Sequence, residues 1–183
     1  MNFFNKLKAN LKVTNKPVTP KVTMDRIVMH WSAGTGMVND VEKKHYHFIV
    51  ASDGTVVPGI HSVEDNIPPL TNYAAHTRML NSNSIGVAVS AMAGAKERPW
   101  SKGAYPITED QVEALARLVA SLSLMYGIKV TPKTVLTHAE VQPTLGVKQK
   151  FKWDITWLPG MDKPQEPTKV GNILRTMITK ELR

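Results

Sequence analysis

Two histidines and one aspartate have the residue types and the placement of a metal site. His30 follows the apolar run 27–29 and His138 follows the run 135–137, so each is expected at the end of a buried strand. Asp154 lies in a later, irregular segment. Two neutral imidazoles and a carboxylate suit a zinc ion whose fourth position is open to water, as in catalytic sites. The same ligands also suit other first-row divalent ions, and each histidine alone could simply pack in the core or lie at the surface.

The composition narrows the choice of chemistry. The chain has no cysteine, which excludes disulfides, a thiolate nucleophile and every cysteine-ligated zinc or iron–sulfur site. Its 183 residues, 42% of them hydrophobic, are enough for one domain with its own core. No apolar run reaches the length of a transmembrane helix, ~18 residues.

The charge is strongly positive and uneven. Lys and Arg number 23 against 15 Asp and Glu, a net charge of +8 that favours polyanionic partners. We expect no nucleic-acid partner, because no nucleic-acid-binding motif is present. Residues 1–23 form a basic tail in which lysines alternate with apolar residues. Residues 1–12 could form an amphipathic helix that contacts an anionic membrane surface, or a solvated tail; no apolar segment typical of a secretory signal follows.

The patterns after the tail predict a single domain over residues 24–183 that mixes strands and helices, an α/β or α+β fold. The spacing Thr108 to Gln111 matches a capping box, and the apolar period after it predicts a helix over 108–126. Segments 61–83 and 139–164 show no clear period. The other expected elements are strands at 26–31, 84–91 and 135–138, a hairpin over 46–57 with an Asp-Gly turn, and a helix over 170–182.

Five sequence blocks occur in an order that resembles a known family. They are Ile27-Val28-Met29-His30-Trp31-Ser32-Ala33-Gly34, Tyr46-His47-Phe48-Ile49-Val50 with Asp53-Gly54-Thr55-Val56, Asn83-Ser84-Ile85-Gly86-Val87, Thr137-His138-Ala139-Glu140-Val141-Gln142-Pro143 and Lys152-Trp153-Asp154-Ile155. Over about residues 24–160 the chain resembles the zinc-dependent N-acetylmuramoyl-L-alanine amidases of type 2. That family includes phage endolysins, bacterial recycling amidases and peptidoglycan recognition proteins. The resemblance implies an α/β fold: a central mixed β-sheet with helices on both faces.

The resemblance also implies roles for single residues. His30, His138 and Asp154 match the ligands of one zinc ion, and Lys152 matches the family's catalytic lysine. Tyr46 matches a tyrosine that assists catalysis in the phage enzymes. Some recycling enzymes instead use a glutamate on the strand after the Ser-Ile-Gly block, and this chain has no carboxylate there. His76 matches a segment that lines the substrate cleft.

The implied activity is zinc-dependent hydrolysis of the amide between N-acetylmuramic acid and L-alanine in peptidoglycan, by a phage or prophage endolysin. The alternatives are a peptidoglycan-binding module without catalysis and an intracellular muropeptide-recycling amidase. We expect a monomer that is made in the cytoplasm without a secretory signal and acts on the cell wall after release. Glu140 is expected to be a solvated loop acid, although a partner of a metal ligand is the other interpretation.

Overall fold

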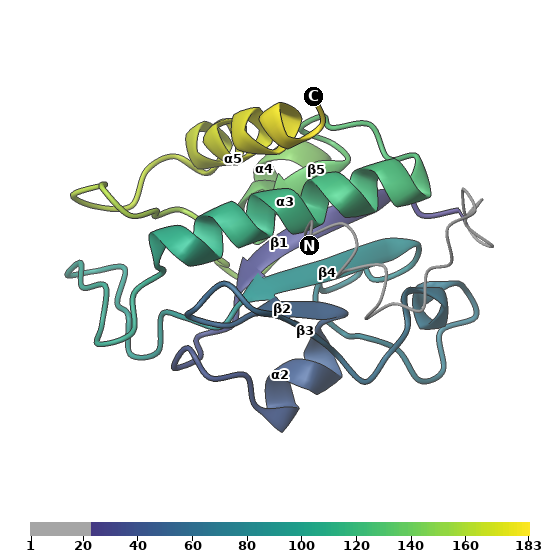
Figure 1. The fold of residues 1–183 in the computed structure, drawn as a ribbon, viewed down its shortest axis with the longest axis horizontal. Helices are drawn as coiled ribbons and strands as arrows, with labels where there is room; N and C mark the ends of the chain where they lie inside the picture. Colours follow the sequence, from purple (N-terminus) through teal and green to yellow (C-terminus); the bar gives the residue numbers. More distant parts are fainter. Residues whose placement is uncertain (1–22) are drawn as a thin grey trace.

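Five strands form one mixed sheet in the order β3-β2-β4-β1-β5 in the computed structural model, which describes residues 23–183 (Figure 1). Strand β1 pairs in parallel with β4 and with β5, and β2 pairs in parallel with β4. Strand β3 is antiparallel to β2, with which it forms a hairpin. The mixed sheet predicted from the sequence is therefore confirmed. The strands are β1 (Arg26–Trp31), β2 (Phe48–Val50), β3 (Val56–Pro58), β4 (Ser84–Val89) and β5 (Val135–Thr137).

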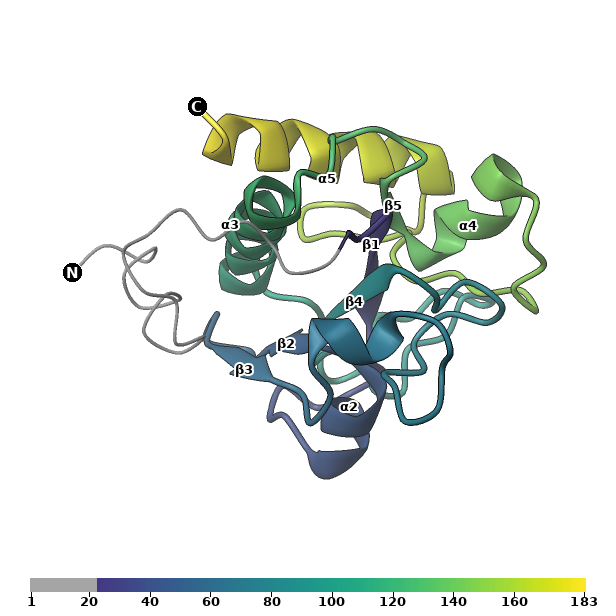
Figure 2. The ribbon, with the colours of Figure 1, turned by 90° about the vertical axis from the view of Figure 1, so that its right-hand side faces the viewer.

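Helices cover both faces of the sheet. The long helices α3 (Glu109–Tyr126) and α5 (Pro167–Glu181) pack side by side on one face. Figure 2 places α4 (His138–Leu145) on the opposite side, with the short helix α2 (Asp40–His45) beyond β2. A 3₁₀ helix, η1 (Val63–Asn66), contacts β4. Among residues 23–183, no helix is both long and apolar enough to cross a membrane.

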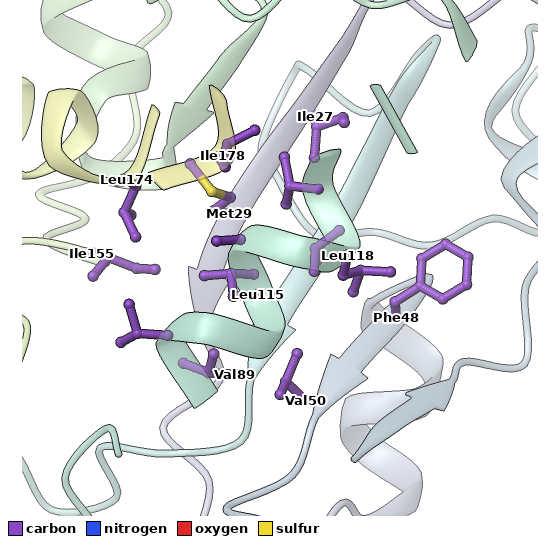
Figure 3. Packing of buried hydrophobic residues seen from close by; sticks show 14 of the residues in the cluster. Ile27, Met29, Phe48, Val50, Val89, Leu115, Leu118, Ile155, Leu174 and Ile178 are labelled. Atoms are coloured by element: carbon purple, nitrogen blue, oxygen red, sulfur yellow. The ribbon is translucent and has the colours of Figure 1, made fainter. Parts of the chain in front are cut away.

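The alternation of side chains along β1 divides the core. Ile27 and Met29 belong to the large apolar cluster between the sheet, α3 and α5 (Figure 3). Val28 belongs to a second, smaller cluster that includes Val141 of α4. Because successive side chains of a strand point to opposite faces, His30 shares the face of Val28. The main core therefore fixes β1 in place, while the end of the strand directs His30 toward α4.

The predicted long helix is confirmed with its caps. The Thr108 side chain accepts a hydrogen bond from the backbone N–H of Gln111 at 3.1 Å, which satisfies a donor that the helix itself leaves free. Gly127 ends the helix with a φ of 65°, a left-handed conformation that glycine adopts without strain. Helix α5 begins at residue 167 rather than at 170, with Pro167 in its first turn.

Two helices were missed from the sequence. The segment 139–164 was expected to lack regular structure, yet residues 138–145 form α4 despite the internal Pro143. Helix α2 precedes Tyr46, which was expected in a strand and instead caps the end of this helix. Helices of six and eight residues are too short to show a helical period in the sequence. The stability of each helix therefore depends on its capping box and on packing. The predicted amphipathic tail, residues 1–23, lies outside the described residues except for Thr23.

Candidate metal centre and active site

His30, His138 and Asp154 converge at the carboxyl end of the parallel strands. Their potential ligand atoms all lie within 4.8 Å of one another, and all three residues are buried. The Asp154 Oδ2 atom is 3.0 Å from Nδ1 of His30 and 3.1 Å from Nδ1 of His138. The structure therefore brings together the three residues that the sequence proposed as metal ligands.

The local backbone explains how residues so far apart in the sequence meet. His30 is the fifth residue of β1, and His138 is the first residue of α4, directly after the neighbouring strand β5. The backbone N–H of Ala139 donates a hydrogen bond to the carbonyl oxygen of Asp154. This bond ties the irregular segment that carries Asp154 to the start of α4, beside His138.

The orientation of the Gln149 amide determines which ring nitrogen of His138 carries the proton. The amide group of Gln149 donates to the carbonyl oxygens of Arg78, at 2.9 Å, and Val147, at 3.3 Å, so its Oε1 atom faces the imidazole. The His138 Nε2–H donates to this Oε1 at 2.9 Å, which leaves a lone pair on Nδ1 of the neutral ring. That lone pair faces the Asp154 carboxylate, and a cation between the two would stabilise both. The donor set therefore fits a divalent ion.

The protonation states also suit metal binding. Burial lowers the pKa of His30 from 6.5 to about 4, although the hydrogen bond with Asp154 opposes this shift. Burial alone would raise the pKa of Asp154, but the interactions with the imidazoles of His138 and His30 outweigh it and lower the pKa to about 2. At neutral pH the site therefore offers a neutral imidazole and a carboxylate, the forms that coordinate metals.

Two further predicted residues lie beside the cluster. The Tyr46 ring centroid is 5.1 Å from that of His30, and burial raises the pKa of its hydroxyl. Helix α2, which Tyr46 caps, is held by the buried residue Glu42. The Glu42 carboxylate accepts hydrogen bonds from the Ser32 hydroxyl and from the backbone N–H of Asn39, the N-cap of the helix. Lys152 is exposed, and its positive charge acts on His30. Glu42 and Gln149 were not singled out from the sequence, because their partners are defined only by the fold.

His76 is buried against His30 rather than exposed to solvent. It is 6% exposed, and its Nδ1 atom is 3.3 Å from Nε2 of His30 and 2.8 Å from the hydroxyl of Thr77. Gly86 of β4 makes room for this ring, since a Cβ at that position would lie 2.3 Å from Cγ of His76. The structure thus places His76 where it orients His30, and its predicted contact with substrate stays a prediction.

Comparison with known proteins agrees with this arrangement. Residues 20–156 match the family model described as N-acetylmuramoyl-L-alanine amidase. The chain is 31% identical over 126 residues to the endolysin of Klebsiella phage KP32, covering 67% of this chain and 70% of that protein. The chain belongs to the N-acetylmuramoyl-L-alanine amidase family. The fold is also similar to Staphylococcus aureus hydrolase AmiA in complex with its ligand, with a TM-score of 0.51, 14% identity and coverage of 100% of this chain and 91% of that one.

In this amidase-family chain, the expectation that Glu140 is a solvated loop acid is wrong. Glu140 is fully buried, and both of its carboxylate oxygens bind Arg175 of α5, at 2.8 and 3.1 Å. The same carboxylate accepts the backbone N–H of Thr137 at 2.8 Å, next to the candidate ligand His138. A side chain at Gly171 would collide with this carboxylate, because its Cβ would lie 2.0 Å from Oε2. The pair joins α5 to the turn that carries His138.

His47, which was not assigned as a ligand, has a structural role on the other side of His76. Its Nδ1 atom accepts the backbone N–H of Gly86 at 2.9 Å, so the ring proton lies on Nε2 and is donated to Asn66 at 3.1 Å. Asn66 in turn binds the backbone of Ala74 and Asn81. His47 therefore helps to hold the loop that contains His76, while its neighbour His45 is exposed on α2.

We expect His47 to make the fold sensitive to acid. Burial lowers its pKa from 6.5 to about 4, so the unfolded chain binds this proton at a higher pH than the folded chain does. Its contribution to stability is complete above pH ~6.5 and is lost as the pH falls toward ~4, by up to about 3 kcal/mol. Urea unfolding of His47→Gln between pH 7 and 4 should show a shallower decline than the parent chain. An unchanged slope, or an equal change in the exposed control His45→Gln, would contradict this assignment.

Proposed function

We propose that this chain hydrolyses the amide between N-acetylmuramic acid and L-alanine in peptidoglycan with one zinc ion, as a phage or prophage endolysin. The observation that carries the proposal is the buried convergence of His30, His138 and Asp154 in a chain of this family. The relative named endolysin supports the phage role. In this proposal the protein is made in the cytoplasm and reaches the cell wall after release.

The roles of the residues follow from their positions. When bound by His30, His138 and Asp154, zinc supplies a Lewis acid that activates water and polarises a carbonyl. The Lys152 ammonium, exposed beside the cluster, donates hydrogen bonds to the amide oxygen as negative charge develops on it. The Tyr46 hydroxyl, beside His30, donates a proton or hydrogen bond to the departing amine. Burial raises the pKa of this hydroxyl above the ordinary value near ~10, so it is protonated at neutral pH, which favours the donor role.

The test is digestion of purified sacculi by the zinc-loaded protein, with newly freed amino groups of L-alanine as the readout. We expect release that stops with a chelator and returns with added zinc. Binding to sacculi without release would instead support a peptidoglycan-binding module. Faster cleavage of soluble muropeptides than of intact sacculi would support a recycling amidase; the absence of a carboxylate in Ser84–Val89 counts against that reading.

We expect Lys152→Ala to bind zinc as the parent does and to lose most of its turnover. Removing a donor to a developing oxyanion lowers the rate by ~10²-fold or more. The measurement is kcat on sacculi together with zinc content by elemental analysis. Lys163→Ala, which removes an exposed lysine nearby in the sequence, is the matched control and should keep parental kcat. A Lys152→Ala enzyme with parental turnover would remove this residue from the mechanism.

Tyr46→Phe is expected to keep zinc and slow catalysis. The ring and its packing against His30 stay in place, and only the hydroxyl is lost, so the fall in kcat reports the proton or hydrogen bond that it donates. General acid–base groups contribute ~10²–10⁴-fold, and a partial, assisting role predicts a fall toward the lower limit. Parental turnover in Tyr46→Phe, with parental zinc content, would assign this ring to packing alone.

A further inference from the structure

An open pocket of about 410 Å³ lies at the surface between the start of α3, the middle of α5 and the loop 158–161. Its lining is mostly apolar, and the apolar members are Val112, Leu158, Pro159, Met161, Ile173 and Met177. Ile173 is 37% exposed there, although its neighbour Leu174 is buried in the main core. The fold thus leaves an apolar surface uncovered, with a volume at the lower end of small-ligand sites, ~300–1,000 Å³.

The loop wall of this pocket is held by hydrogen bonds. The indole N–H of Trp157 donates to the carbonyl oxygen of Met161 at 2.7 Å, and the backbone N–H of Met161 donates to the carbonyl oxygen of Leu158 at 3.1 Å. Trp157 and Leu158 are themselves buried in the main core. The pocket is therefore formed before a partner arrives, and binding costs little further ordering of its walls.

The rim of the pocket is acidic. Glu109 and Glu113, one turn apart on α3, line it and are exposed, and no cationic side chain lines it among residues 23–183. Within the same residues Glu109 forms no ion pair, and Glu113 forms an exposed pair with Arg117 at 3.3 Å. An apolar floor with a carboxylate rim fits a partner that carries apolar side chains flanked by cations.

The N-terminal residues of the same chain carry this complementary pattern. Residues 1–22 contain five lysines and no acidic residue. Four large apolar residues near the start recur at a spacing that places them on one side of a helix, and they are Phe3, Phe4, Leu7 and Leu11. Lysines 6, 8 and 12 then flank that side. An amphipathic helix that lays its apolar side into an apolar groove is a recurring mode of recognition, and so short a helix is marginal in water without such a surface.

The linker from the tail to the domain is long enough for this contact. The start of α3 lies at the carboxyl end of the strands, because the Gln111 side chain donates to the carbonyl oxygens of Val50, at 3.1 Å, and Ser90, at 2.9 Å. Strand β1, which follows the tail, runs toward that end and spans ~20 Å over its six residues. Residues 13–22, when extended, reach up to ~33 Å. A tether of this length keeps the tail at a millimolar effective concentration near the pocket, so a weak contact is enough to hold it.

We propose that residues 1–12 dock in this pocket as an amphipathic helix of the same chain. Its apolar side covers Ile173 and Met177, and its lysines lie beside Glu109 and Glu113. The docked helix also covers the loop 158–161, which begins four residues after Asp154. This docking does not depend on the proposed function, because it uses no residue of the metal cluster.

A distance measurement in the full chain tests the docking. The chain has no cysteine, so spin labels are attached at two introduced ones, Asn5→Cys on the polar side of the tail helix and Asp162→Cys beside the loop wall. Pulsed dipolar electron paramagnetic resonance then gives the distribution of distances between the labels. We expect one narrow population at low ionic strength, and a smaller one in 1 M salt, where charges are screened beyond ~3 Å.

Variants of both partners assign the contact. Ile173→Ser in the pocket and Leu7→Ser in the tail should each lower the docking equilibrium by about tenfold, the effect of losing one buried apolar side chain, and broaden the distribution. Leu124→Ser is the matched control, because it removes an exposed apolar side chain of α3 outside the pocket, and it should keep the narrow population. Thermal unfolding checks that each variant is folded, and Leu7→Ser lies outside the domain whose folding is in question.

Three results would overturn the proposal. The first is a broad distribution in the parent chain, including the case in which its tail binds only to vesicles of anionic lipid. The second is the same broadening in Leu124→Ser as in Ile173→Ser. The third is a distance signal in a mixture of chains that each carry one of the two labels, which would show that the tail docks on a second copy.

Discussion

Replacing Asp154 with alanine is expected to abolish zinc binding and amide hydrolysis together. Its Oδ2 atom lies near Nδ1 of both His30 and His138, at 3.0 and 3.1 Å. Without it, two neutral imidazoles remain, and they neither complete the ligand set nor offset the charge of a divalent ion. Mutating a residue that only holds a metal ligand in place lowers metal affinity by ~10–100-fold. Loss of a ligand itself should therefore lower zinc affinity by at least ~10²-fold.

The experiment measures zinc affinity with a competing chelator and kcat on sacculi for the same preparations. Asp162→Ala is the matched control, because it removes an exposed aspartate of a nearby loop. Thermal unfolding without added zinc separates a lost ligand from a lost fold. Parental zinc affinity in a folded Asp154→Ala protein would show that the three residues do not form the metal site, and the proposed mechanism would then fail.

The convergence of the candidate site was predictable from the residue types together and from the way strand ends meet. His30 and His138 each follow a short apolar run, and parallel neighbouring strands bring such positions to one edge of a sheet. Asp154 was proposed beside them from its residue type, and the resemblance then matched the same residue to the third ligand. Lys152 and Tyr46 followed from the same blocks, and the structure places both beside the cluster.

The supporting contacts were not predictable, because their partners are distant in sequence and are defined only after folding. From the sequence, Glu140 was expected to be a loop acid near His138. In the structure α5 places Arg175, 35 residues away, against it. Gln149 lies three residues after Gly146, in a segment with no periodic signal. Helices α2 and α4, with six and eight residues, are shorter than the window of ~11–18 residues over which an apolar period is recognised.

The Glu140–Arg175 pair leads to the second large effect. Glu140→Gln is expected to lower the free energy of unfolding by about 3–5 kcal/mol, because the Arg175 guanidinium then stays buried without its carboxylate. Zinc affinity should fall by ~10–100-fold in the protein that remains folded, since the turn at Thr137 is held less firmly. Urea unfolding and chelator competition measure the two effects. Glu113→Gln, which breaks an exposed pair on α3, should change stability by less than about 1 kcal/mol.

The double variant Glu140→Gln, Arg175→Met separates the effect of the pair on stability from its effect on the position of His138. It removes the unpaired charge, so much of the lost stability should return, as replacing a whole buried ion pair by apolar side chains is often neutral or stabilising. Zinc affinity should stay low, because the link from α5 through the carboxylate to the N–H of Thr137 is still missing. If zinc affinity recovers along with stability, the pair serves the fold alone. If zinc affinity stays low, the pair also holds His138, the proposed metal ligand, in position.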